Sequence, residues 1–221
     1  MSSERPEADR RIPAGEQLRR ALTDLEGRYE TAGSARLGDV LGALGPQAGP
    51  LGAALLALPL ISPMNLGPIT LGASFAIGLL GLGLLRRGTP TPLPERILAL
   101  PVPRAVFRLM RAMLGRLSAW IQRPAPARSS VWVRGEVGRR VCGAGVVAGA
   151  ALLAVPVPVL PLTNTFPALA VVFFVLGWAN RDVRLTAWGG AALLAGVAVF
   201  AALGIGVATV GWTALRGLIP F

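Results

Sequence analysis

The sequence predicts an all-α integral membrane protein. It would contain two proline-broken helical hairpin repeats, a further C-terminal transmembrane helix and a basic amphipathic interfacial helix. Charged residues make up 15% of the chain, against about 25% in soluble domains. Residues 40–85, 141–180 and 185–215 form charge-free runs of 46, 40 and 31 residues. A membrane span needs roughly 20 residues. A soluble core could bury one such run, but three indicate a membrane protein.

Residues 1–39 form a polar segment that we expect to be cytoplasmic. Eight of the eleven acidic residues lie here. Apolar residues recur at helical spacing after Pro13, at Leu18, Leu22, Leu25 and Tyr29. We interpret this segment as a solvated helix docked on the rest of the protein, and a module that binds a cytoplasmic partner remains open. It lacks an apolar signal-peptide core, so internal spans are expected to direct insertion.

Residues 40–85 are expected to form a first broken hairpin. Its two arms meet at the stretch PLISPMNLGP, residues 59–68, which we call knot 1. The second arm, residues 66–85, would measure about 30 Å as a helix, enough to cross a bilayer. In the first arm the clean apolar part, residues 51–58, is too short to span alone. Whether this arm crosses fully or is re-entrant stays open.

Residues 86–140 contain twelve arginines and two glutamates. The arginines flank apolar runs on both sides, which is typical of a cytoplasmic loop and argues against nucleic-acid binding. Anionic lipid headgroups are the expected contact. Within this segment, residues 103–123 predict an amphipathic helix with arginines on one face. Such a helix suits the membrane interface, and also suits packing against the spans from the cytoplasmic side.

Residues 141–180 are expected to form a second broken hairpin, and residues 185–215 a last, uninterrupted span. The second hairpin breaks between Pro156 and Pro167, the stretch that we call knot 2. Between hairpin and span lies a charged turn with Arg181 and Asp182, interpreted as a solvated ion cluster. Trp188 and Trp212 lie near the ends of the last span, where aromatic anchors are common. Its glycines and alanines permit close helix contacts, and a homo-oligomer is kept as a hypothesis.

The two hairpins resemble each other in sequence. ALLALP, residues 54–59, matches ALLAVP, residues 151–156, and an N-x-x-P pattern follows at residues 65–68 and 164–167. Both copies are flanked by arginines at both ends. If those ends face the cytoplasm, each copy is a hairpin and the copies are parallel repeats.

The two knots are the candidate functional site. Prolines free backbone carbonyls, and irregular backbone at membrane depth is tolerated only when buried in protein or lining a wet cavity. Asn65, Thr163, Asn164 and Thr165 could satisfy those groups locally. The candidate residues are Pro59, Pro63, Asn65, Pro68, Pro156, Pro161, Asn164 and Pro167.

Composition excludes several chemistries. All 22 basic residues are arginine, and the chain has no histidine. An imidazole base, a histidine metal ligand and a Schiff-base lysine are therefore ruled out. The one cysteine, Cys142, allows neither an intrachain disulfide nor a cysteine cluster for zinc. We expect no metal, no cofactor and no enzymatic activity.

The segments RLGDVLGALGPQAGPLGAALLALP and LPLTNTFPALAVVFFVLGWANRD are similar to the ExoD family of bacterial exopolysaccharide-synthesis proteins. The resemblance covers roughly residues 16–204. Its most specific part is P-x-x-N-x-x-P-A, followed by an apolar arm and a polar turn with aspartate, here residues 161–182. It implies a small protein of the bacterial inner (plasma) membrane that is linked to exopolysaccharide production.

Two functions are considered. The first is a non-enzymatic accessory role in exopolysaccharide synthesis or export, with the synthesis or export machinery as partner. The second is a small transporter or ion pathway with its site at the paired knots, because broken helices form substrate sites in secondary transporters. Neither broken run contains an ionisable residue that could relay protons.

Overall fold

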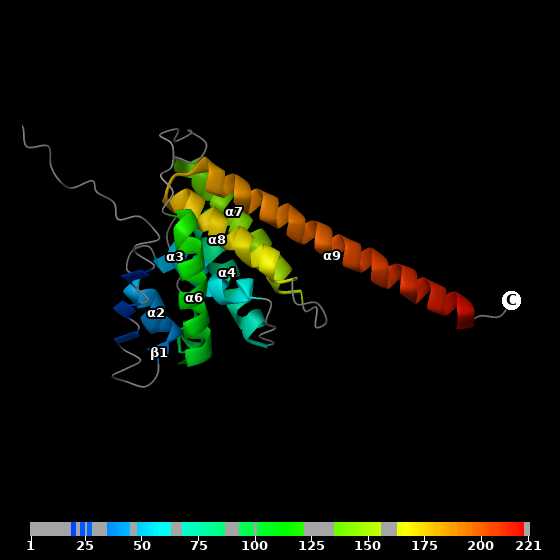
Figure 1. The fold of residues 1–221 in the computed structure, drawn as a ribbon, viewed down its shortest axis with the longest axis horizontal. Helices are drawn as coiled ribbons and strands as arrows, with labels where there is room; N and C mark the ends of the chain where they lie inside the picture. The colour runs from blue at the N-terminus through cyan, green and yellow to red at the C-terminus, as the bar shows by residue number, and fades with distance from the viewer. Residues whose placement is uncertain are drawn as a thin grey trace, which may run out of the picture.

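A computed structural model describes residues 19–20, 23–24, 26–27, 35–44, 48–62, 68–86, 93–99, 101–121, 135–155 and 163–218. The described part is mostly helical, which confirms the all-α prediction at the level of fold class (Figure 1). One feature was not predicted. Strand β1 (Ala35–Arg36) pairs antiparallel with β2 (Pro101–Val102) and ties the N-terminal segment to the middle of the chain.

The helices follow one another along the chain as α2 (Leu37–Ala43), α3 (Ala48–Ala57), the 3-10 turn η3 (Leu58–Ile61), α4 (Pro68–Arg86), α5 (Glu95–Leu98), α6 (Arg104–Ile121), α7 (Gly135–Leu153), α8 (Thr165–Ala179) and α9 (Val183–Leu218). Before them, Arg19, Thr23 and Glu26 lie in helical backbone, and the Thr23 hydroxyl donates to the Arg19 carbonyl at 3.1 Å. The four apolar residues of the predicted N-terminal helix face lie outside the described residues.

Helices α3, α4, α7 and α8 form a bundle in which each contacts the next and α8 returns to α3. Helices α4 and α7 run antiparallel, because Gly78 lies opposite Ala150 and Gly81 opposite Val146. Helices α7 and α8 are also antiparallel, with Gly145 against Phe174. Leucines of α3 and η3 fill the middle of the core, and Leu51, Leu55 and Leu58 are fully buried.

The antiparallel packing gives the bundle two different ends. Helix α4 ends at Arg86 where α7 begins, and α8 ends nearby at the turn that leads into α9. This charged end contrasts with the opposite end, where α7 stops, α8 starts and α4 starts. The helix ends that flank the two knots therefore lie at the same end of the bundle.

Helix α9 is one continuous helix of 36 residues, about 54 Å long. This confirms the prediction of an uninterrupted C-terminal helix. Its first half packs on α8, with Gly189 against Phe174 and Gly196 against Pro167. Its second half extends well beyond the bundle (Figure 1), and residues 204–209 are all exposed.

Among the described residues, α9 is the one helix with the length and composition of a membrane span, over Val183–Thr209. Three further stretches are apolar but shorter: Gly49–Ile61, Thr70–Arg86 and Thr165–Ala179.

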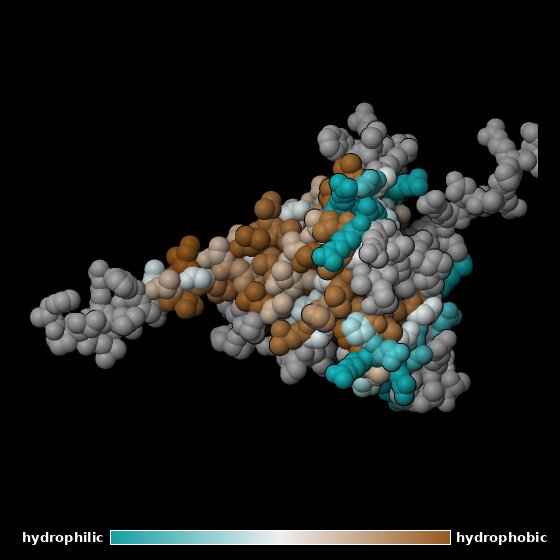
Figure 2. All heavy atoms as spheres, turned by 180° about the vertical axis from the view of Figure 1, so that it is seen from behind, coloured by the Kyte–Doolittle hydropathy of each residue, from teal (hydrophilic) through white to brown (hydrophobic). Residues whose placement is uncertain are grey.

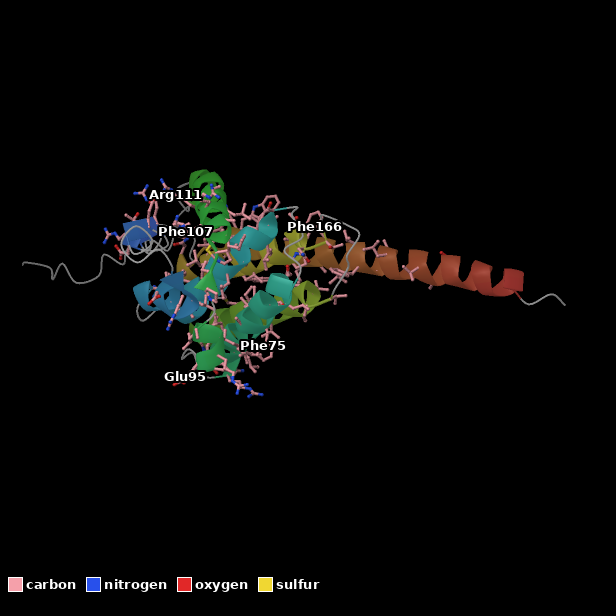
Figure 3. The ribbon with its side chains drawn as sticks, turned by 90° about the horizontal axis from the view of Figure 1, so that it is seen from below. Phe75, Glu95, Phe107, Arg111 and Phe166 are labelled. Carbon is pink, nitrogen blue, oxygen red and sulfur yellow. The ribbon has the colours of Figure 1, made fainter. Side chains whose placement is uncertain are left out.

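Helix α6 crosses the bundle on the side of η3 (Figure 1). The predicted amphipathic helix is confirmed, because Val106, Phe107 and Met110 are buried while Arg108 and Arg111 are exposed. Arg111 forms an ion pair with Glu26 of the N-terminal segment. Figure 3 shows Phe107 and Arg111 on one side of the bundle and Phe75 of α4 on the other.

Candidate functional site

Knot 1 begins where proline ends a helix. Pro59 has no N–H to donate and its ring hinders the preceding turn, so α3 stops at Ala57 and tightens into η3. Pro59 is buried, and its carbonyl accepts a hydrogen bond from the Ser62 N–H at 3.4 Å. The chain resumes as α4 at Pro68, the first helical position, where proline is favoured.

At knot 2 the structure describes the two helix ends that flank it. Helix α7 ends at Leu153, and a short turn follows in which the Val155 N–H donates to the Leu152 carbonyl at 3.2 Å. Val155 precedes Pro156, and a residue before proline avoids the α-helical region. Helix α8 then starts at Thr165, after Asn164 as N-cap. The Asn164 carbonyl accepts the first helical bond, from the Ala168 N–H at 3.0 Å.

The two knots meet through a hydrogen bond. The Thr165 hydroxyl at the start of α8 donates to the Ile61 carbonyl at the end of η3, at 3.1 Å and across 104 residues of sequence. A carbonyl at a helix end lacks an intrahelical partner, and Thr165 supplies one. Thr165 was predicted to satisfy a freed carbonyl of its own knot, and it instead satisfies one of the other.

The buried polar side chains of the described residues gather near these helix breaks. They are Ser62, Thr70, Ser74 and Thr163, all less than 8% exposed. We use the name knot cluster for the hydroxyl residues that flank the two breaks in the sequence, Ser62, Thr70, Thr163 and Thr165, together with the Ile61 carbonyl; the contact that the structure shows among them is the one between Thr165 and Ile61. Ser74 lies one turn further along α4, and its hydroxyl donates to the Leu71 carbonyl at 2.9 Å. The cluster therefore offers neutral hydroxyls and a carbonyl.

Thr70 is exceptional within the knot cluster. Its hydroxyl is buried, and within the described part of the chain it has no hydrogen-bond partner. Such a group costs about 1–3 kcal/mol. Sequence reasoning did not select Thr70 or Ser62. The available signal was weak, a pair of hydroxyl residues at i and i+4 in an apolar run, Thr70 and Ser74.

Of the predicted knot residues, the structure describes Pro59, Pro68, Asn164 and Pro167. Asn164 is half-buried and its side chain makes no capping hydrogen bond. Pro167 is buried against Gly196 of α9. Pro63, Asn65, Pro156 and Pro161 lie outside the described residues. No group of three or more potential metal ligands occurs among the residues that were placed.

The charged turn at Arg181 and Asp182 has a structural explanation. Arg181 adopts a left-handed φ of 54°. The Asp182 N–H donates to the Gly177 carbonyl at 2.7 Å and the Arg181 N–H to the Trp178 carbonyl at 3.2 Å. This is the Schellman arrangement that ends a helix. The Asp182 carboxylate then accepts the Arg184 N–H at 2.8 Å, as the N-cap of α9.

A second charged group joins α4 to α7 at the same end. The Arg139 guanidinium of α7 donates to the carbonyls of Leu84 and Leu85, the latter at 3.1 Å, at the last turn of α4. Its side chain is 18% exposed and lies 3.7 Å from Glu136. Arg140 also pairs with Glu136 but is largely exposed. Helix α7 thus begins at Gly135, inside the segment predicted to be a loop.

Sequence comparisons relate the chain to known proteins. The family model described as "Exopolysaccharide synthesis, ExoD" matches residues 18–202. Protein ExoD of Rhizobium meliloti (strain 1021) is 31% identical over 155 residues, which cover 68% of this chain and 62% of the relative. The chain thus spans less than two thirds of that relative's length. No solved structure matches. Because the family model covers most of the chain, this protein belongs to the ExoD family.

Proposed function

We propose that this protein is a multi-pass protein of the bacterial inner membrane that supports exopolysaccharide synthesis or export in a non-enzymatic accessory role. Family membership is the observation that carries the proposal, because the family is described by exopolysaccharide synthesis. The relative of the same name shares 31% identity with this chain.

The exposed surface supports a membrane location. The apolar segment Val183–Thr209 has a mean hydropathy of 2.4, and 6% of its span window is buried. A core helix of a soluble protein would be mostly buried. Large apolar side chains are also exposed on the bundle, including Leu71 and Phe75 of α4 and Val141 of α7. Figure 2 shows this apolar surface extending along the molecule, with hydrophilic residues gathered toward the end opposite the α9 tip.

The charge distribution supports an orientation with the charged end in the cytoplasm. Arg86, Arg139 and Arg181 all lie at that end, and positive residues favour the cytoplasmic side. Helix α6 buries Val106, Phe107 and Met110 and exposes Arg108 and Arg111, a basic amphipathic character that suits a membrane interface. The arginine-rich middle segment would then be cytoplasmic, next to anionic headgroups.

The arrangement of the arms supports a duplication. Helix α3 with η3 pairs with α4, and α7 pairs with α8. The helix ends that flank the two knots lie at the same end of the bundle, which supports two parallel broken hairpins. On this proposal, the hydrogen bond from Thr165 to the Ile61 carbonyl joins the two hairpins inside the membrane. Unsatisfied backbone groups are costly there.

A genetic experiment tests the accessory role. Deleting the gene should lower the yield of secreted polysaccharide, and wild-type protein should restore it. An unchanged yield in the deletion strain contradicts the proposal. Membranes isolated from the deletion strain should still polymerise added sugar nucleotides, because the protein is not the polymerising enzyme. A purified protein that itself elongated or cleaved the polymer would overturn the accessory role.

A small transporter or ion pathway is the second candidate. Two observations favour it: the contact between the knots, and the buried Thr70 hydroxyl, which has no hydrogen-bond partner among the described residues. Broken helices form binding sites in transporters. Protein in liposomes should then pass cations or protons faster than empty liposomes do, and Asn65→Ala/Asn164→Ala should slow this flux. Equal flux in wild type and variant would remove the knots as a transport site.

A further inference from the structure

A groove of about 450 Å³ runs between α4 and α7 on the side of the bundle that carries Phe75 (Figure 3). Its lining includes Leu71, Phe75 and Gly78 of α4, and Val147, Ala151 and Ala154 of α7. The helices come close at Gly78, where an added Cβ would lie 3.6 Å from that of Ala150. The Phe75 side chain lines the groove next to this close contact and is 60% exposed. Ser74 also lines the groove, but its hydroxyl is engaged by Leu71 of its own helix.

The dimensions of the groove indicate what it can hold. From Leu71 to Leu82 it follows α4 for eleven residue steps, about 16 Å, which is about half of the ~30 Å hydrocarbon layer. The lining is almost entirely apolar, with Ser74 as its one hydroxyl residue. The length and the apolar lining of the groove therefore suit one hydrocarbon chain within one leaflet.

Two arginines continue the groove toward the charged end. Arg86 follows Leu82 at i+4 on α4, and Arg140 precedes Val147 by seven residues on α7, so each lies on the groove-lining face of its helix. Both side chains are exposed, although Arg140 shares its charge with Glu136. The two helices meet here, because Arg139 binds the last carbonyls of α4. An apolar groove thus opens beside a cationic end.

We propose that the groove between α4 and α7 binds an anionic phospholipid, with one acyl chain against Phe75 and Ala151 and the phosphate at Arg86 and Arg140. Basic pockets between transmembrane helices on the cytoplasmic side recognise anionic headgroups. This inference rests on the proposed membrane location, since the bilayer supplies the lipid. It is independent of the role in exopolysaccharide synthesis.

The test uses the full chain in nanodiscs that contain phosphatidylglycerol with a photoreactive group near the end of one acyl chain. Crosslinks should concentrate on the groove residues of α4 and α7. Retention of phosphatidylglycerol is then followed by native mass spectrometry. Arg86→Gln/Arg140→Gln should lower it at least five-fold relative to Arg108→Gln, an exposed arginine of α6. Ala151→Phe/Ala154→Phe should lower the crosslinks, and Ala201→Phe on exposed α9 should not.

Each other outcome overturns the proposal. Equal retention of phosphatidylcholine would show that the protein does not recognise the anionic headgroup. Displacement of phosphatidylglycerol by a small amount of isoprenoid phosphate would show that the groove binds a different lipid. Crosslinks spread evenly over the surface would show ordinary solvation by lipid, and this wild-type result does not depend on folding of a variant. Resistance of the protein to alkaline carbonate extraction separates the two proposals. A resistant protein without groove crosslinks refutes the lipid site alone, whereas an extracted protein refutes the membrane location.

Discussion

At the scale of single residues, the corner between α8 and α9 depends on the absence of a side chain at Gly177. A Cβ there would lie 2.4 Å from the Thr186 hydroxyl oxygen and 2.6 Å from the Thr186 backbone nitrogen. Gly177→Ala should therefore force the two helices apart. We expect a loss of about 1–3 kcal/mol, which is typical of overpacking, measured as a lower thermal midpoint in detergent by circular dichroism.

Gly190 provides the matched control within the same helix pair. A Cβ at Gly190 would meet nothing within 4 Å, and alanine is favoured over glycine inside a helix by about 1 kcal/mol. Gly190→Ala should leave the thermal midpoint unchanged or raise it. Equal losses in both variants would mean that close packing at Gly177 does not hold the corner.

The knot cluster yields a prediction with two opposite signs. Thr165→Val removes the donor to the Ile61 carbonyl and should destabilise the protein by about 1 kcal/mol. Thr70→Val removes a buried hydroxyl that has no partner among the described residues, so stability should stay the same or rise. Thermal unfolding in detergent checks both, with Thr209→Val on exposed α9 as control. A clear loss in Thr70→Val would reveal a partner, such as a bound water or ligand.

At the scale of elements, α4 and α7 are joined by more than apolar packing. Arg139 donates to two carbonyls at the last turn of α4. Hydrogen bonds to charged groups contribute about 1.5–3 kcal/mol, so Arg139→Gln should lower stability by an amount in this range. Arg140→Gln is the control, because Arg140 is exposed and pairs only with exposed Glu136 among the contacts described for it. Chemical unfolding in detergent compares the stability of the two variants. Equal losses would show that the hydrogen bonds from Arg139 to α4 do not stabilise the protein.

The breaks between elements were predictable because the effect of proline is local. Pro59 lies at the end of α3, as the sequence pattern indicated, and α4 begins at Pro68, two residues after the predicted start of the second arm. The start of α7 at Gly135 was not predicted. Glu136, Arg139 and Arg140 suggested a loop, but they form ion pairs at i+3 and i+4 that suit a first helical turn.

The candidate site was only partly predictable, because its contacts join segments that are far apart in the sequence. The bond between Thr165 and Ile61 depends on packing between segments 104 residues apart, and no local pattern specifies it. Burial of Thr70 likewise follows from the way α4 packs. The charged turn, in contrast, depends on local geometry. Arg181 takes its left-handed conformation at the end of α8, and Asp182 is the N-cap of α9, which follows directly.

At the scale of the whole molecule, the length of α9 provides a test of orientation. From Val183 to Thr209 the helix rises about 39 Å, more than the ~30 Å of a hydrocarbon layer. If the charged end is cytoplasmic, Thr209 should reach the opposite side. Ala99 follows α5 in the middle segment, is exposed, and should stay in the cytoplasm.

Single cysteines at these two positions measure the orientation. The native Cys142 is buried in α7 and is first replaced by alanine. In intact spheroplasts a membrane-impermeant maleimide should label Thr209→Cys and leave Ala99→Cys unmodified, because the arginine-rich segment stays inside. Inverted vesicles should reverse the pattern, and detergent should expose both. Labelling of Ala99→Cys from outside would invert the orientation, and would place the arginine end of the lipid groove in the outer leaflet.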